Sequence, residues 1–126
     1  MENQSSIEQE TQVSKLTLNE LDQFTGTEYY HKYFGINLTD GCLFVAKKGR
    51  AYWIFDLIAS YQFEQKVRKE PFQVWYFKKE GIGGIITCDD GNGNIVASQV
   101  IEYTDFPLDE IKFFVTSQVC MLTSEH

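Results

Sequence analysis

The clearest structural pattern in the chain is AYWIFDLIASYQFEQKV at residues 51–67, followed by the run FQVWYF at residues 72–77. In the first stretch, apolar residues recur at the spacing i, i+3, i+4, i+7, which predicts an amphipathic helix. Pro71 cannot continue this helix, and the aromatic and β-branched residues that follow it favour a strand. The sequence therefore predicts one long helix that leads into a sheet. The apolar stripe of the helix consists of Ile54, Leu57, Ile58 and Tyr61.

The chain beyond this first strand is predicted to consist mainly of further strands. Gly81, Gly83 and Gly84 indicate a loop after the first strand. The run DDGNGN at residues 89–94 predicts a hairpin turn, because Asp-Gly and Asn-Gly sequences accept positive φ angles. Pro107 lacks an N–H donor and indicates a bend. The later strands are predicted at residues 85–88, 95–101, 111–115 and 119–122.

Upstream of the long helix, the sequence predicts a short helix and a hairpin. Thr17 and Glu20 form a capping-box pattern, in which Glu20 reaches back to the start of a helix that ends before Gly26. Aromatic residues with turn residues after them then indicate two paired strands. The hairpin is predicted from a strand at 28–34, a Thr-Asp-Gly turn at 39–41 and a strand at 42–46.

These elements predict an α+β fold with one antiparallel sheet of five to seven strands, one main helix packed on a face, and a short N-terminal helix. The 126 residues are enough for one hydrophobic core. Residues 1–13 are rich in Glu, Gln and Ser and are predicted to be a disordered tail. Residues 14–126 are predicted to form a single globular domain.

The composition predicts a cytoplasmic protein. No apolar run approaches the ~18 residues of a membrane span, and the N-terminus lacks the pattern of a secretory signal. Cys42, Cys88 and Cys120 are odd in number and form no C-x-x-C pattern, which favours buried, reduced thiols. The formal net charge is −7, whereas residues 47–79 carry 8 basic and 3 acidic side chains. Such an uneven charge distribution can attract a partner.

No pattern in the sequence specifies catalysis, and we predict no metal site and no cofactor. A zinc site would need His31 to meet a cysteine in space. The loop at residues 89–94 has oxygen side chains at alternate positions, as in a calcium loop, but Ile95 stands where such a loop needs glycine. A hairpin turn explains this loop better. The nucleophile pattern G-x-S-x-G is absent.

Several segments in a fixed order form a recognisable pattern. They are FTGT at 24–27 followed by Tyr29-Tyr30, TDG at 39–41, AYW at 51–53 with Asp56, Ile58 and Ser60, FQVW at 72–75 and YTDFPL at 103–108. This pattern resembles an uncharacterised family of small proteins from bacteria, cyanobacteria, phages and mobile elements, over roughly residues 18–126. The chain ends in LTSEH, where the family pattern has Leu-Pro-Ser-Glu-Tyr. The resemblance implies one domain and a microbial origin, and it implies no activity.

We therefore expect a non-enzymatic protein-interaction module, in the form of an accessory or inhibitory protein of a phage or mobile element that acts on a host protein. Acidic segments can meet a basic partner surface, and aromatic side chains form interface hot spots. The partner is an unidentified protein; neither nucleic acid nor a membrane is expected, and a homo-oligomer stays open. The candidate binding residues are Lys47, Lys48, Arg50, Trp75, Asp89, Asp90 and Asp105.

One alternative is a small hydrolase or transferase that uses Asp56, Asp105, His31 or a cysteine. This alternative requires at least three of these groups to line one concave pocket. A structural role is also open for the two aspartates. Asp56 would then be held by a tyrosine or by backbone donors, and Asp105 would bond its own turn before Pro107.

The other alternative is a single-strand nucleic-acid binder. Here the basic segment at residues 47–79 would contact phosphates, and Trp75 or Tyr76 would stack on bases. Binding of this kind would weaken steeply with added salt.

Overall fold

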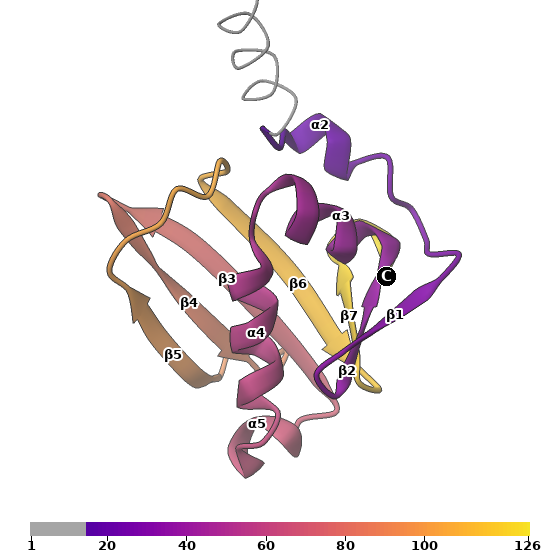
Figure 1. Ribbon diagram of the computed structural model, residues 1–126. Helices are drawn as coiled ribbons and strands as arrows, with labels where there is room; N and C mark the ends of the chain where they lie inside the picture. The colour runs from indigo at the N-terminus through magenta and orange to yellow at the C-terminus, as the bar shows by residue number, and fades with distance from the viewer. Residues whose placement is uncertain (1–14) are drawn as a thin grey trace, which may run out of the picture.

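Seven strands form one mixed sheet in the computed structural model, and helices pack against one of its faces (Figure 1). The structure describes residues 15–126, so the tail predicted at residues 1–13 lies outside the described residues. The α+β prediction with a single sheet is confirmed. Among the described residues, no helix has the length and apolar character needed to cross a bilayer.

The strands lie in the order β1-β2-β7-β6-β3-β4-β5, and every neighbouring pair is antiparallel except β2 with β7. This parallel pair corrects the prediction of a fully antiparallel sheet. Parallel strands need a long crossover, and here nearly the whole domain lies between the two partners. The strands are β1 (Tyr30–Tyr33), β2 (Ile36–Thr39), β3 (Phe72–Glu80), β4 (Gly83–Asp89), β5 (Ile95–Ile101), β6 (Glu110–Thr116) and β7 (Val119–Leu122).

The N-terminal hairpin differs from its prediction. The turn lies at Phe34-Gly35, between β1 and β2, and residues 42–46 belong to helix α3 (Asp40–Lys48) rather than to a strand. Thr39 is the N-cap of α3, and its side chain accepts a hydrogen bond from the Cys42 N–H. An acidic first turn and two lysines in the last turn suit the helix dipole. The sequence at 39–41 is thus a helix start, not a hairpin turn.

The helix predicted at residues 51–67 is divided into α4 (Tyr52–Tyr61) and α5 (Gln65–Arg68). The division occurs at Gln62, whose side-chain amide pairs with Gln73 and also donates to the carbonyl of Ile58. The capping box at the first helix, α2 (Leu18–Leu21), is confirmed, because Glu20 accepts a hydrogen bond from the Thr17 N–H. A short 3-10 helix, η1 (Thr123–Glu125), follows β7.

The core lies between the sheet and helices α3 and α4. Phe55 of α4 packs edge to face on Phe113 of β6, with ring centroids 5.1 Å apart. Trp75 and Phe77 point from β3 into the same core and are almost completely buried. Since strand side chains alternate, Tyr76 points to the opposite face of the sheet. Helices α3 and α4 lie on the other face of the sheet (Figure 1), and the His126 ring after η1 packs on Phe72 and Phe114 of the Tyr76 face.

Candidate functional site

A shallow pocket of about 510 Å³ lies between the tip of the β1–β2 hairpin and the outer side of α4. Aromatic rings and one carboxylate dominate its walls, and small residues of α4 complete it. These groups lie together because the β1–β2 turn is next to the second half of α4. The lining residues are Tyr33, Phe34, Asp56, Ala59, Ser60 and Phe63.

Tyr33 and Asp56 hold the hairpin and the helix together inside this pocket. The Tyr33 hydroxyl donates a hydrogen bond to Oδ1 of Asp56, and the Tyr33 ring stacks on Tyr52 with centroids 6.0 Å apart. Burial, and then the Asp56 carboxylate, raises the pKa of Tyr33 to about 12, so its hydroxyl stays protonated. Oδ2 of Asp56 has no hydrogen-bond partner within residues 15–126, and the side chain is exposed.

Phe34 and Phe63 form the outer walls of the pocket. Their exposed fractions are 74% and 77%, which is unusual for phenylalanine in a protein with a well-filled core. Phe34 also has a φ of 47°, in the left-handed region that Gly and Asn normally occupy in such a turn. Its ring lies edge-on to Tyr33 at 4.9 Å. The strained backbone at Phe34 thus keeps its ring exposed to solvent in the same pocket as the Asp56 carboxylate.

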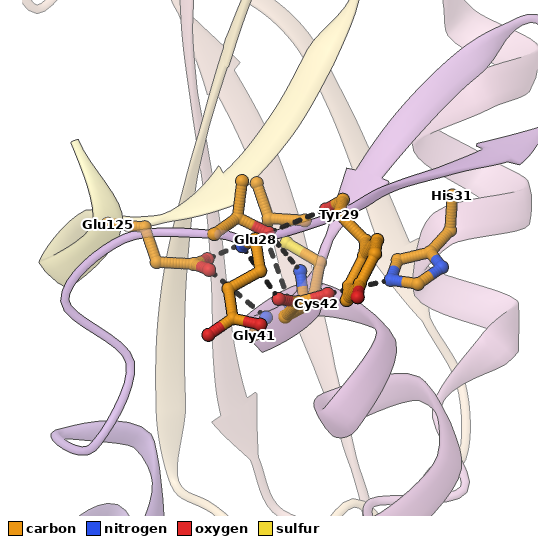
Figure 2. A network of polar contacts seen from close by, with 9 residues as sticks. Glu28, Tyr29, His31, Gly41, Cys42 and Glu125 are labelled. Carbon is orange, nitrogen blue, oxygen red and sulfur yellow. Dashed lines mark hydrogen bonds and ion pairs between the residues drawn. The ribbon is translucent and has the colours of Figure 1, made fainter.

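A second polar cluster joins His31 to the start of α3 (Figure 2). Nε2 of His31 lies 2.8 Å from Oδ1 of Asp40, and the other Asp40 oxygen accepts the Glu28 N–H at 2.9 Å. The Asp40 N–H in turn donates to the Thr27 hydroxyl at 2.8 Å. His31 and Tyr33 are two residues apart in β1, so they point to the same side of the strand. Each of them bonds a carboxylate from a helix.

Glu125 approaches the same helix start from the opposite side (Figure 2). Its carboxylate accepts hydrogen bonds from the Thr39 hydroxyl at 2.6 Å and from the N–H groups of Gly41 and Leu122 at 3.1 Å and 2.9 Å. A carboxylate at a helix N-terminus is stabilised by the helix dipole. Because both oxygens of Asp40 and both oxygens of Glu125 accept hydrogen bonds from within the fold, we interpret the cluster as structural.

The Asp40 cluster predicts a pH-dependent stability. The hydrogen bond from His31, and next that from the Glu28 N–H, lowers the pKa of Asp40 from its usual 3.8. A carboxyl with a lowered pKa in the folded state stabilises the fold above pH 3.8, and this contribution is lost as the pH falls further. We expect Asp40→Asn to be less stable than the wild type at pH 7, with a smaller difference at pH 3. Urea unfolding at both pH values measures this, and a difference independent of pH would contradict it.

The basic candidates predicted from the sequence lie at the end of α3. Lys47 and Arg50 are exposed, whereas Lys48 forms an ion pair with Glu20, which lowers the pKa of that carboxyl. Lys48 also lies over the ring of Phe44, 5.6 Å from its centroid. None of these basic residues lines the aromatic pocket. Their role in binding stays a prediction.

Trp75 is only 1% exposed, so it lies in the core and not on the surface where the sequence-based prediction placed it.

The acidic candidates Asp89 and Asp90 accept hydrogen bonds within the predicted hairpin turn between β4 and β5. Oδ1 of Asp89 accepts the Gly91 N–H at 2.7 Å, and the Asn94 side chain lowers the pKa of Asp90. Binding by these two aspartates stays a prediction.

Asp105 is exposed in the loop between β5 and β6. The hydroxyl of Thr104, rather than the carboxylate of Asp105, accepts the Phe106 N–H in this bend. This contact corrects the expectation that Asp105 bonds its own turn before Pro107. Asp56, by contrast, is held by a tyrosine as expected, although it is exposed rather than buried.

The residues proposed for an enzyme do not meet in the aromatic pocket. Asp56 lines it, but His31, Asp105 and the cysteines do not. All three cysteines are buried, as predicted, and burial raises the pKa of the Cys42 and Cys88 thiols, the latter to about 12. Thiols of this kind are poor nucleophiles.

The pocket residues Tyr33, Phe34 and Phe63 were not singled out from the sequence. One indication was present: Phe34 directly precedes Gly35 between two β-prone runs, the arrangement of a two-residue hairpin turn. A phenylalanine at such a position must point outward or strain the chain. Phe63 falls outside the apolar stripe of the predicted helix, which also indicated exposure.

Comparison with known proteins places this domain in a family. A model of the family of unknown function DUF6876 matches residues 15–126. The chain belongs to this family. The DUF6876 match confirms the resemblance found in the sequence, and it covers the whole described fold, including the aromatic pocket. No curated protein and no solved structure matched the chain.

Proposed function

We propose that this protein is a binding module that takes up the cationic end of a lysine or arginine side chain of a partner protein. The pocket between the β1–β2 hairpin and α4 is the proposed site. The observation that supports it is that the Asp56 carboxylate, one oxygen of which has no hydrogen-bond partner within residues 15–126, lines the same pocket as the exposed rings of Phe34 and Phe63. A carboxylate beside aromatic faces is suited to an organic cation.

The energetics favour a ligand for these rings. Four other phenylalanines, among them Phe55 and Phe113, are fully buried. The exposure of Phe34 and Phe63 is therefore not explained by the lack of a core that can bury such rings. Exposed aromatic side chains beside one another are typical of interaction sites. A cation over an aromatic ring gains about 0.5–2 kcal/mol, depending on how far it is desolvated. The Asp56 carboxylate adds a charge-assisted hydrogen bond.

The shape and charge of the site favour a partner protein over a small molecule. Sites for small molecules are clefts that enclose most of the ligand surface. This pocket is wide and open, which suits the tip of one side chain presented by a larger surface. The net charge of −7 attracts a basic partner over distances near the Debye length.

The proposal includes a cytoplasmic setting and, through the family resemblance, a host protein as the target of a phage or mobile-element accessory or inhibitory protein. The cysteine pattern supports the first part. Three cysteines, an odd number with no C-x-x-C pattern, form no disulfide framework, which fits a reducing compartment.

The test is an NMR titration of the ¹⁵N-labelled protein with N-acetyl-arginine amide and N-acetyl-lysine amide. We expect chemical-shift changes confined to the backbone amides of the hairpin turn and the end of α4, near Phe34, Ser60 and Phe63. N-acetyl-norleucine amide, which has the lysine chain without its charge, should cause far smaller changes. Equal changes with norleucine, or changes centred elsewhere, would refute the proposal.

Asp56→Asn separates the charge from the fold. The asparagine oxygen can still accept the Tyr33 hydroxyl proton, so we expect normal stability but at least about tenfold weaker binding of the arginine probe. Asp105→Asn removes an equally exposed carboxylate outside the pocket and should leave binding unchanged. If Asp105→Asn weakens binding and Asp56→Asn does not, the acidic surface predicted from the sequence is the site instead.

Phe34→Gly provides a second, independent variant. Glycine adopts a φ of 47° without strain, so the variant should be at least as stable as the wild type. Loss of the ring should nevertheless weaken binding of the arginine probe. A variant that keeps its stability and its affinity would show that the Phe34 ring is not part of the site.

A further inference from the structure

The two carboxylate oxygens of Asp56 are not equally available in the aromatic pocket. Oδ1 accepts the hydrogen bond from the Tyr33 hydroxyl, whereas Oδ2 has no hydrogen-bond partner within residues 15–126. The hydroxyl keeps its proton at neutral pH, because burial and the neighbouring carboxylate raise the pKa of Tyr33 to about 12. A ligand that enters the pocket therefore meets a carboxylate with one oxygen already bonded.

Ring contacts hold Tyr33 in place independently of its hydroxyl. The ring stacks on Tyr52 with centroids 6.0 Å apart, and it lies at 86° to the ring of Phe34 with centroids 4.9 Å apart. Backbone pairing with Ile36 fixes Tyr33 at the end of β1. The hydroxyl is thus presented to Asp56 by a ring that packs on two other aromatic rings.

Lysine and arginine differ in what they require of a carboxylate. The planar guanidinium of arginine forms its strongest contact when two parallel N–H groups bond both carboxylate oxygens. The ammonium of lysine is a compact charge with three donors, and one oxygen is enough for it. Because Tyr33 engages Oδ1, this two-bond contact is not available to arginine at Asp56, whereas Oδ2 can still accept from lysine.

Ser60 offers a second single oxygen in the same pocket. Asp56 and Ser60 lie four residues apart in α4, so they are neighbours on one face of the helix, and both line the pocket. The Ser60 hydroxyl donates its proton to the carbonyl of Leu57 at 2.8 Å, so toward a ligand it presents its oxygen as an acceptor. The N–H groups of an ammonium diverge, which suits separate acceptors better than the parallel donors of a guanidinium do.

We propose that Tyr33 makes the pocket selective for the ammonium group of lysine over the guanidinium group of arginine, because its hydroxyl keeps Oδ1 of Asp56 engaged. This inference rests on the proposed function and narrows it from either cation to a lysine side chain of the partner protein. Arginine still gains from stacking on aromatic rings, so it binds more weakly rather than not at all.

The experiment compares dissociation constants for the two charged probes in the same NMR titration. We expect the wild type to bind N-acetyl-lysine amide about threefold more tightly than N-acetyl-arginine amide, which is the size of one exposed charged contact. Tyr33→Phe keeps the ring and makes both Asp56 oxygens available. It should shift the ratio of the two dissociation constants toward arginine by at least about threefold.

Tyr30→Phe is the matched control, because it removes the same hydroxyl from the same strand at a position that is 62% exposed and does not line the pocket. It should leave the ratio unchanged. Circular dichroism verifies that both variants are folded.

The outcomes separate this inference from the proposed function. If Tyr33→Phe weakens both probes equally or leaves the ratio unchanged, the hydroxyl only supports the fold and the inference is wrong. A wild type that prefers arginine, or a ratio that shifts in Tyr30→Phe as well, would also overturn the inference while the cation site stands. If neither probe binds at the pocket, the proposed function fails and the inference fails with it.

Discussion

Gln73→Leu is expected to lower the free energy of unfolding by about 3 kcal/mol, even though leucine has a similar volume and fills an apolar core. Gln73 is 3% exposed and serves three partners. Its Oε1 accepts the indole N–H of Trp75 at 2.9 Å, and its Nε2 donates to the carbonyl of Val67 at 3.1 Å. Its amide also pairs twice with that of Gln62, at 2.9 Å in both directions. Leucine satisfies none of these groups.

The cost arises from partners that stay buried without a hydrogen bond. An unsatisfied buried donor or acceptor costs about 1–3 kcal/mol, which exceeds the net gain from the bond itself. Urea unfolding measures the loss. Gln23→Leu at an exposed position is the control and should change stability by less than about 0.5 kcal/mol. In a Trp75→Phe background the indole donor is absent, so Gln73→Leu should cost about 1 kcal/mol less. A neutral Gln73→Leu would contradict this account.

The same Gln62–Gln73 pair explains where sequence periodicity failed in α4. The apolar stripe continues to Tyr61, and no helix-terminating residue such as glycine or proline directly follows it. The stop comes from β3, because Gln62 turns inward to bond Gln73, and the chain bends so that Val67 is buried in α5. A contact between distant residues overrides local preference here. Periodicity can predict the helix but not this end.

In α3, by contrast, the local information was sufficient and the turn interpretation was wrong. Thr39 followed by Asp40, with Lys47 and Lys48 eight residues on, is a helix start and stop. Cys42, together with the apolar residues three and four positions later, fits helical spacing as well as it fits a short strand. Gly41, a residue typical of turns, made this helical pattern difficult to recognise. It is needed because a Cβ there would lie 2.6 Å from Leu122 and Glu125.

The candidate site was predictable only in part. The expectation that a tyrosine holds Asp56 follows from the cost of an unpaired carboxylate, and Tyr33 does so. Which aromatic residues stay exposed could not be predicted from the composition, because 15% aromatic residues fit a core and a binding surface equally well. The hairpin that places Phe34 in the same pocket as Phe63 depends on the parallel β2–β7 pair, which joins residues far apart in the chain.

Gly83→Ala is expected to destabilise the protein by about 3 kcal/mol, the upper part of the range for overpacking. Gly83 was predicted to lie in a loop with Gly81, and the structure places it in β4 instead. Its φ is not in the left-handed region, so conformational freedom does not explain the glycine. The reason is space, because a Cβ at Gly83 would collide with the carbonyl oxygen of Ile101 and lie 2.6 Å from that of Glu102.

Both obstacles are backbone atoms at the end of β5, so no side-chain rotation can relieve the collision and the β4–β5 hairpin must shift. Gly26→Ala is the matched control, since a Cβ there meets nothing within 4 Å and the φ of Gly26 is also outside the left-handed region. It should change stability by less than about 0.5 kcal/mol. Thermal unfolding of both variants makes the comparison. If Gly83→Ala melts together with Gly26→Ala, the close approach of β5 to Gly83 does not exist in solution.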